Sequence, residues 1–550
     1  MSDTGLEKQF NETGSAQSDI DLLTFHEHRA GRRVIDPEEA RIELGEVVAS
    51  RLKLSADGTK VLWPQPTDSP LDPQNWSPTR KALQLFIITL ASIVPDFDSG
   101  IGVTAVFSLA EQYKTTPDVV NNITSKCIHF GKGWGGIFAV ILIRRYGRLP
   151  ILFWWILAML FLLGATIAPN LSTFAVLTSP EGLYVVTDMY PFHLQAQKLN
   201  IWTFGFIVSP FLSPFVFGFV VAQTTWRWAY GAGTIYSGLV CLLILLFGEE
   251  TMYDRGVKPI PEPPTNGLRY RVKTLLGITG LKMVKYRDSW SRAILSPFRI
   301  VWRPQLIGIL VFEGMMFGFG IGINVTNAVF LGTPRPFGFG FSQFGIAGFY
   351  GTPIVAVFLG ELIGRYTNDW IMNVPIRRNG GVFEAESRLW ACYIAIPLYT
   401  CGLLVLGGAF QNHLSIGALV MGWGITECAT VAVIAYCRDS FPRHHGEVNA
   451  LINLARVLGG KNIPHLNRIP TTIEMICSHE GFSVAYFQIP WALKDGALQV
   501  LGVEAASVLA FLRLTCSSHP AGNAASLPAA GLFLLAVPVL QIRGRRSRMG

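Results

Sequence analysis

Six carboxylates lie within strongly apolar stretches of this sequence, where an ionisable side chain is costly and is therefore a candidate for function. They are Asp96, Asp98, Glu313, Glu361, Glu427 and Glu504. Asp96 and Asp98 are two residues apart, so they would point to different faces of a helix. Pro95 precedes them, and we expect the helix to break there and to turn backbone carbonyls toward a cavity. Glu313 opens a glycine-rich stretch that suits a flexible gate.

Aromatic side chains accompany these acids and favour one kind of ligand. Phe97 lies between Asp96 and Asp98, Phe312 precedes Glu313, and Trp423 precedes Glu427 by four residues. Carboxylates and aromatic faces together attract organic cations through charge and cation–π interactions. Apart from Arg365, which follows Glu361, Lys and Arg are lacking within the apolar stretches assigned to these acids.

We therefore predict a site that binds protons and an organic cation, either a xenobiotic or a polyamine-like amine. Asp96 or Asp98 and Glu313 would alternate between proton and substrate, with Glu427 and Trp423 as further binding candidates. The alternative for each acid is a structural hydrogen bond or a place at the water interface. We expect no cofactor and no metal, because the eight cysteines lack metal-site spacing and form no recognisable disulfide framework.

Membrane-spanning helices would have to position these residues. Of 550 residues, 50% are apolar and 15% are charged, whereas about a quarter are charged in an ordinary soluble domain. This balance excludes most soluble classes, and so much apolar surface excludes disorder for most of the chain. Apolar runs of a length that can span a bilayer fall into two groups, residues 82–248 and 305–541. The sequence predicts an all-α membrane protein.

The net charge of +8 is concentrated in the loop between the two groups and in the C-terminal tail, while the N-terminal tail is acidic. Loops rich in Lys and Arg stay in the cytosol, so we expect both termini there, in the plasma membrane or alternatively the vacuolar membrane. The charge then marks topology rather than a nucleic-acid partner. The predicted parts are a polar N-terminal tail (1–80), an N-terminal transmembrane half (81–250), a basic loop (251–304), a C-terminal transmembrane half (305–542) and a basic tail (543–550).

Short motifs are distributed along nearly the whole chain. They include Asp72–Trp76 before the first span, Gly135–Pro150 after the second, Tyr184–Trp202 at the fifth, Trp226–Trp228 before the sixth, and Asn368–Trp370 with Arg377–Glu386 after the eighth. With these motifs the chain resembles the major facilitator superfamily, and more closely its fungal drug:proton-antiporter-like branch. The resemblance implies a major facilitator fold, in which two six-helix halves rock around a midplane site.

The loop between spans two and three would control the conformation of such a transporter. Gly147 permits a tight turn, and the neighbouring arginines can bind a helix C-terminus or a carboxylate across the two halves. Such a contact would latch one state, although the family usually has Asp where Arg144 falls. The alternative is that these arginines only enforce topology. The gating residues assigned on this basis are Gly136, Arg144, Arg145, Gly147, Arg148, Glu361, Arg365 and Asp369.

Span five contains small residues and prolines that let a helix bend and pack closely. These are Gly205, Pro210, Pro214 and Gly218. The run resembles the antiporter motif of proton-coupled exporters, which favours antiport.

The chain departs from the family in four places. At Lys126–Lys132, where span two should begin, two lysines shorten the apolar run. Span four is nearly absent around residues 174–185, and the polar segments Lys461–Glu480 and Ser507–Ala530 interrupt spans eleven and twelve. Either these segments are retained introns, with a lost exon piece at span four, or the sequence has diverged. Sequencing of the transcript separates the two explanations.

The leading function is a secondary transporter, acting as a monomer in the lipid bilayer on a small-molecule substrate and protons. Alternatives are a non-transporting membrane sensor, or an inactive product of an imperfect gene structure. No nucleotide-binding loop or hydrolase motif is present, so we predict neither an enzyme nor an ATP-driven pump.

Overall fold

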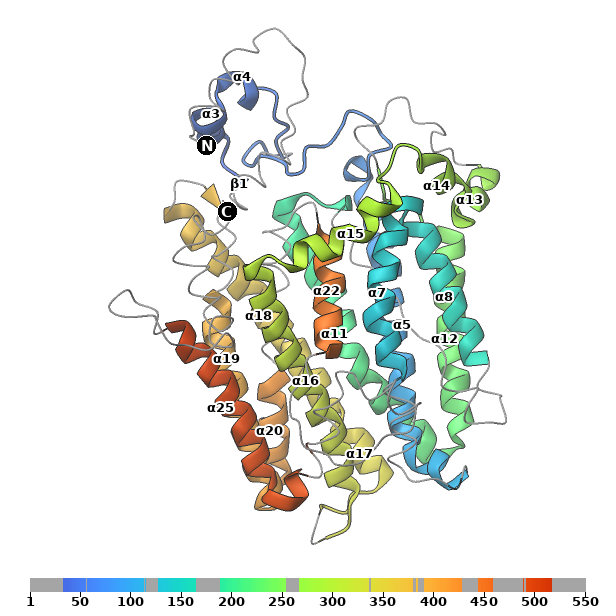
Figure 1. Cartoon of the computed structure of the whole chain (residues 1–550), viewed down its shortest axis with the longest axis vertical. Coiled ribbons are helices and arrows are strands. Elements are labelled where there is room, and N and C mark those ends of the chain that lie inside the picture. The colour runs from blue at the N-terminus through green and yellow to red at the C-terminus, as the bar shows by residue number, and fades with distance from the viewer. Residues whose placement is uncertain are drawn as a thin grey trace.

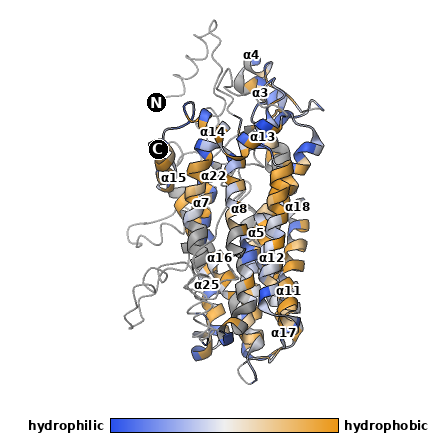
Figure 2. Cartoon of the chain, turned by 90° about the vertical axis from the view of Figure 1, so that its right-hand side faces the viewer, coloured by the Kyte–Doolittle hydropathy of each residue, from blue (hydrophilic) through white to orange (hydrophobic). Residues whose placement is uncertain are grey.

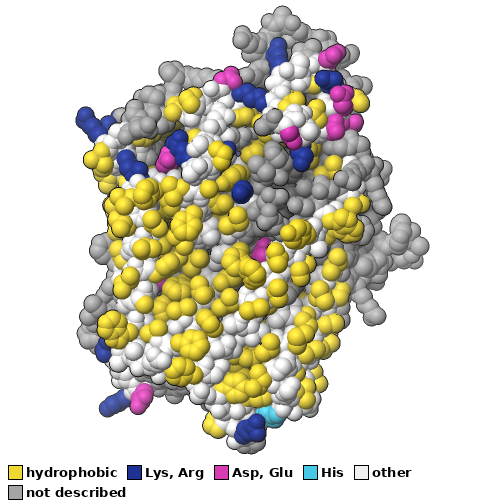
Figure 3. All heavy atoms as spheres, turned by 180° about the vertical axis from the view of Figure 1, so that it is seen from behind, with side chains coloured by type: hydrophobic (Ala, Val, Ile, Leu, Met, Phe, Trp, Pro, Cys, Tyr) yellow, Lys and Arg dark blue, Asp and Glu magenta, His cyan; other side chains and the backbone are white. Residues whose placement is uncertain are grey.

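The computed structural model describes residues 33–55, 57–112, 114, 127–164, 188–253, 267–335, 338–378, 382–383, 390–427, 444–458, 488 and 491–516. These residues form a bundle of long helices that run roughly side by side (Figure 1). Five segments in this part of the chain are long and apolar enough to cross a membrane: Ile201–Gln223, Trp226–Phe247, Leu306–Gly332, Gln343–Gly364 and Ile394–Gln411. Hydrophobic side chains follow the middle of the helices and cover the middle of one face, while charged side chains gather toward the two ends (Figures 2 and 3).

The first group of bundle helices comprises α5 (Pro78–Gln112), α7 (Cys127–Tyr146), α8 (Arg148–Gly164), α11 (Phe192–Gln223) and α12 (Trp226–Phe247). The predicted gap in span four falls at residues 165–187, outside the described residues. We call this group the N-half.

The second group comprises α16 (Pro304–Gly332), α17 (Gln343–Phe349), α18 (Gly351–Arg378), α19 (Trp390–Gln411), α20 (Ile416–Glu427), α22 (His445–Leu458) and α25 (Ala497–Cys516). We call it the C-half. The segment Lys461–Glu480 lies outside the described residues. The expected interruption at Ser507 is wrong in its position, because α25 continues from Ala497 to Cys516 without a break.

Three short helices connect the halves: α13 (Leu268–Leu275), α14 (Ile278–Met283) and α15 (Trp290–Val301). They lie at one end of the bundle, which we call the loop end (Figure 1). The chain before α5 adds α3 (Pro37–Leu44), α4 (Glu46–Ala49), a 3-10 helix (Pro73–Asn75) and strand β1 (Arg33–Val34). Strand β1 pairs antiparallel with β2 (Val382–Phe383), which joins the N-terminal segment to the loop after α18.

The two halves repeat one packing scheme. In the N-half the first helix packs on the fifth (α5 on α11) and the third on the sixth (α8 on α12). If α22 and α25 are counted as eleventh and twelfth, the C-half repeats both contacts, as α16 on α22 and α19 on α25. Two seams join the halves, α7 with α22 and α11 with α18. Both join a second-position helix of one half to a fifth-position helix of the other, as an internal two-fold repeat requires.

Small residues set the contact between α5 and α11. A side-chain carbon on Gly205 would lie 2.8 Å from Cγ2 of Thr89. One turn further along each helix, the Ser209 hydroxyl donates to the Ile93 carbonyl at 2.6 Å. Near the other end of α11, a side-chain carbon on Gly218 would lie 2.7 Å from Cβ of Ala347 in α17. Small residues therefore let α11 approach both halves closely.

Prolines interrupt neither α5 nor α11. Pro210 and Pro214 lie inside the continuous helix α11. The predicted break at Pro95 is also wrong, because α5 continues through it to Gln112. Side-chain hydroxyls from neighbouring helices donate to carbonyls in the turn before this proline. Tyr236 donates to Leu90 at 2.8 Å, and Ser209 donates to Ile93. Such donors allow a helix to tolerate proline within a bundle.

The motif before α5 forms a cap on the bundle. Asp72 is fully buried and accepts hydrogen bonds from the backbone of Thr67 and Gln74, at 3.0 and 3.1 Å. Trp76 then lies under the guanidinium of Arg80, 4.0 Å from its ring centre. The motif thus fixes where the chain enters the first helix.

Candidate functional site

The α7–α22 seam contains an ion pair between the halves at the loop end. Nη1 of Arg144, in the last turn of α7, lies 2.9 Å from Oε1 of Glu447, in the first turn of α22. The Glu447 side chain is completely buried, and the Arg144 side chain is 21% exposed. A charge this deeply buried needs a partner and hydrogen bonds. The contact therefore holds the ends of two helices from different halves together.

The loop helix α15 joins this ion pair. The Ser296 hydroxyl donates to Oε1 of Glu447 at 2.9 Å and accepts from Nη1 of Arg144 at 2.9 Å. Nδ1 of His444 lies 3.6 Å from the same carboxylate, and Asp288 lies 3.6 Å from Arg144. We call these five residues the loop-end network.

Gly147 turns the chain between α7 and α8 and makes room for a carboxylate. Its φ of +102° is in the region that favours glycine. A side-chain carbon there would lie 2.5 Å from Oε2 of Glu250. The Glu250 carboxylate accepts from the backbone N–H groups of Arg148 and Leu149, each at 3.0–3.1 Å. It therefore caps the N-terminus of α8, where a negative charge is favourable.

The other two arginines of this loop bind within the loop end. The Arg145 guanidinium lies 4.5 Å from the ring centre of Trp290 and donates to the Asp288 carbonyl. Arg148 forms an ion pair with Asp188, which lies just before α11. Of the three predicted arginines, Arg144 is thus the one that the structure places against a carboxylate of the other half.

A second buried ion pair lies deeper, within the C-half. Oε2 of Glu313 on α16 accepts from Nε and Nη2 of Arg456 on α22, at 3.0 and 2.9 Å. Both side chains are at most 7% exposed. The guanidinium also faces the rings of Phe317 and Phe206, at 5.2 and 5.8 Å. Because Phe206 belongs to α11 of the N-half, this pair borders the surface between the halves.

The acids of α5 are located elsewhere. Asp98 is buried, and its Oδ2 accepts from the Ser237 hydroxyl of α12 at 3.1 Å, whereas Asp96 is partly exposed. Phe97 packs against Phe217 at 4.7 Å, also within the N-half. The structure therefore does not gather Asp98 and Glu313 around one contact: each binds a partner of its own half.

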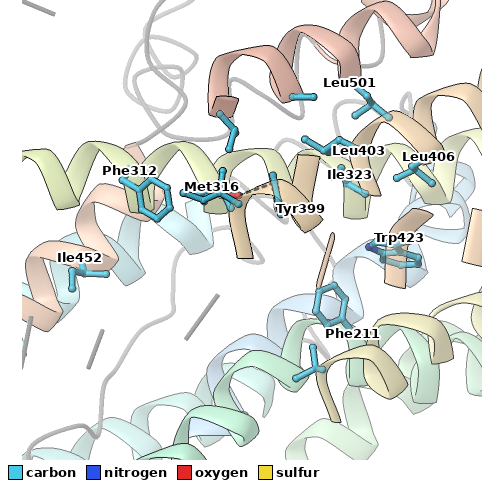
Figure 4. Close-up of a cluster of buried hydrophobic side chains, with 14 of the residues drawn as sticks. Phe211, Phe312, Met316, Ile323, Tyr399, Leu403, Leu406, Trp423, Ile452 and Leu501 are labelled. Atoms are coloured by element: carbon cyan, nitrogen blue, oxygen red, sulfur yellow. Dashed lines mark hydrogen bonds between the residues drawn. The ribbon is translucent and has the colours of Figure 1, made fainter. Parts of the chain in front are cut away.

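Trp423 links the halves by aromatic packing. It is fully buried, and its ring centre lies 5.3 Å from Phe349, 5.3 Å from Tyr350 and 6.0 Å from Phe211 of α11. Its Nε1 donates to Oε1 of Glu427 at 3.2 Å. Figure 4 shows Phe211 beside Trp423, with Phe312 further along the same buried cluster.

The remaining predicted gating residues lie on α7 and α18. Gly136 is buried in α7. Glu361 is partly exposed on α18, and no described residue donates a hydrogen bond to its buried Oε1. Arg365 and Asp369 belong to α18, but their side chains lie outside the described residues. Within the described ranges, no group of three or more side chains is arranged to hold a metal ion.

Sequence reasoning missed the partners of the charged residues. Lys and Arg are absent from the apolar stretch that contains Glu313, but Arg456 reaches Glu313 from a different helix. Glu447 belongs to a further family-like motif, Phe441–Arg443 with Gly446–Glu447, but the sequence did not predict its pairing with Arg144. Arg456 lies in the same apolar run, at 446–459, where a charge of either sign is a signal of function. A third buried group was also missed: Gln488 accepts from Thr326 and donates to Glu504, which is 2% exposed.

Comparisons with known proteins agree on one family. The sequence profile of the Major Facilitator Superfamily matches residues 87–460. An uncharacterised MFS-type transporter of Schizosaccharomyces pombe is 24% identical over 71% of this chain and 78% of its own length. The efflux pump radE of Floropilus chiversii is 21% identical, over 80% and 83%. A crystal structure of the peptide transporter POT with sulfate superposes with a TM-score of 0.51 at 14% identity, over 85% of this chain and 96% of that one. The last likeness shows a shared fold.

Replacing Gly147 by Ala is expected to destabilise the protein by about 1–3 kcal/mol, because the backbone conformation disfavours a side chain and the new carbon meets Glu250. The control is Gly231→Ala in α12, where a side-chain carbon meets nothing within 4 Å and alanine favours the helix by about 1 kcal/mol. Reversible unfolding in mixed micelles measures both. Equal stability of Gly147→Ala and the wild type would contradict this account of the turn.

A double-mutant cycle tests the pairing of Arg144 with Glu447. Each single change, Arg144→Gln or Glu447→Gln, should lower the free energy of unfolding by about 3 kcal/mol, since it leaves the other charge buried and unpaired. The double variant should lose clearly less than the sum of the two singles. Strictly additive losses would show that the two side chains do not interact.

Proposed function

Since the chain belongs to the Major Facilitator Superfamily and carries small molecules across a membrane rather than catalysing a reaction, we propose that it works by alternating access coupled to protons. The α7–α22 seam is closed by the loop-end network. In this proposal the seam opens when Arg144 and Glu447 separate, and the halves then rock apart at the loop end.

The observation that carries the proton coupling is the ion pair of Glu313 with Arg456. A proton that binds the Glu313 carboxylate removes its charge, and the attraction to the guanidinium is lost. Arg456 lies between α16, α22 and the ring of Phe206 on α11. Loss of this pair therefore changes packing at the surface along which the halves move.

This geometry changes the role that we assign to Glu313. While it is paired with Arg456 it cannot also bind an organic cation, so Glu313 handles the proton. Cation binding then falls to Asp98 or Asp96, beside Phe97. Glu427 with Trp423 supplies a second acid and aromatic ring in the C-half. The substrate class we propose remains an organic cation, a xenobiotic or a polyamine-like amine.

The direction of transport follows from the antiport hypothesis. A relative named as an efflux pump supports export, as does the small-residue face of α11, and both fit the drug:proton-antiporter-like branch. We further propose a monomer in the plasma membrane with the loop end and both termini in the cytosol, and parts divided at residues 80, 250, 304 and 542. The concentration of positive charge in the connecting loop supports this orientation.

Glu313→Gln should abolish the pH dependence of transport, because glutamine neither binds a proton nor pairs ionically with Arg456. Purified protein in vesicles is tested for movement of ethidium, a fluorescent organic cation, with and without a pH gradient. We expect the gradient-driven rate to fall roughly tenfold or more, as loss of an interaction of about 1.4 kcal/mol gives. Asp98→Asn should instead weaken ethidium binding and leave the pH response of the residual transport in place.

The matched control is Glu111→Gln, which removes an exposed carboxylate at the end of α5 and should behave as the wild type. Unchanged, pH-driven transport in both Glu313→Gln and Asp98→Asn would contradict the proposed roles. Transport of a neutral fluorescent probe but not of ethidium would contradict the substrate class alone.

A further inference from the structure

Helix α15 of the connecting loop has one face buried against the bundle. Ala293, Ser296, Pro297 and Ile300 are its buried residues. It packs on α7, α22 and α16, so this face contacts helices of both halves. Ser296 on this face belongs to the loop-end network, through its hydrogen bonds to Glu447 and Arg144.

A second face of the same helix is apolar but exposed. At 100° per residue, its large side chains fall on one sector next to the buried face. Trp302, directly after the helix, is 78% exposed, and four helix residues are 43–46% exposed: Trp290, Ile294, Leu295 and Phe298. A contiguous group of large, exposed apolar side chains normally marks an interaction surface.

A third sector borders the apolar one and is basic. Arg299 and Arg292 fall beside Leu295 on the helical wheel, and Arg303 follows. All three are exposed. Neither Arg292 nor Arg299 forms an ion pair with any residue that the structure describes. Within the described part of the chain, no carboxylate neutralises either charge.

The position of α15 indicates what that partner is. The helix lies across the loop end and leads through Trp302 and Arg303 directly into α16 (Figure 1). The α16 segment Leu306–Gly332 is long and apolar enough to span a membrane. The exposed sector of α15 therefore adjoins the end of a helix that can span a bilayer, where lipid headgroups would lie. A helix with an apolar sector and a flanking basic sector is suited to lie in this interface.

We propose that α15 is a membrane-interface helix that binds anionic phospholipid headgroups through Arg292 and Arg299. Its apolar sector inserts between the acyl chains, and its buried face transmits this binding to the loop-end network through Ser296. Anionic lipid at the loop end then favours the closed α7–α22 seam. The lipid binding is independent of the proposed transport cycle, whereas its effect on the seam rests on that proposed function.

Lipid retention by the full-length protein tests the binding step. The protein is equilibrated in mixed phosphatidylcholine and phosphatidylserine, purified, and examined by native mass spectrometry. The wild type should retain phosphatidylserine in preference to phosphatidylcholine. Arg292→Gln with Arg299→Gln should lose most of this preference, roughly 30-fold, since each basic residue near an anionic surface contributes about a factor of five to affinity.

The control removes two exposed positive charges outside the connecting loop, with Arg227→Gln and Lys494→Gln. It should retain phosphatidylserine as the wild type does. Equal retention by the α15 variant and the wild type would overturn the proposal, as would an equal loss in the control.

Transmission from bound lipid to the loop-end network is tested separately with Ser296→Ala. This change removes the hydrogen bonds of Ser296 to Glu447 and Arg144 and keeps Arg292 and Arg299. Thermal unfolding in nanodiscs should shift upward when phosphatidylserine is added to the wild type, and this shift should shrink in Ser296→Ala while lipid retention stays unchanged. A full shift in Ser296→Ala would reject transmission through Ser296 and leave the binding result standing. Neither measurement uses transport, so failure here is distinguishable from failure of the proposed function.

Discussion

The requirement that buried charges be paired governs the arrangement of this protein. In an apolar bundle an isolated charge is expensive, so the two most deeply buried acid–base pairs each join residues on different helices. Glu447 binds Arg144 across the seam between the halves, and Glu313 binds Arg456 within the C-half. Both basic-to-acidic contacts end on α22. This helix therefore connects the closed seam at the loop end with the ion pair that we assign to the proton.

The same helix explains how an event inside the C-half reaches the loop end. Glu447 and Arg456 are nine residues apart on α22, or about 13 Å at 1.5 Å per residue. A change at Arg456 that shifts this helix also shifts Glu447 against α7 and α15. In the N-half, the helix at the position equivalent to α22 is α11. Its small residues allow it to approach α5 and α17 closely. Helix pairs α5–α11 and α16–α22 pack within the halves, and the α7–α22 and α11–α18 seams join the halves.

The helix-level architecture was predictable because it depends on local sequence. Apolar runs, a basic connecting loop and motifs such as Asp72–Trp76 indicated the family and the two groups of helices. The predicted break at Pro95 failed because hydroxyls of Ser209 and Tyr236, distant in sequence, satisfy carbonyls of α5. The expected end of span twelve at Ser507 failed because the following residues, although assigned to an insert, are helix-forming and apolar up to Cys516.

The candidate site was predictable only in part. Single residues such as Asp98, Glu313 and Arg144 could be selected by type and position, since a charge in an apolar stretch is visible in the sequence. Their partners Ser237, Arg456 and Glu447 lie more than a hundred residues away, and nothing local specifies such pairs. The pairing of Glu313 with Arg456 is the basis on which we propose that Glu313 binds a proton rather than an organic cation.

The central claim is that the pair of Arg144 and Glu447 holds the two halves together at the loop end. Its most direct test is the distance between spin labels at positions 247 and 370, near the loop ends of α12 and α18, measured by double electron–electron resonance on a background without native cysteines. We predict one short distance in the otherwise unchanged protein, and a second, longer distance that gains population in Arg144→Gln. An identical distance distribution in both proteins would contradict the claim.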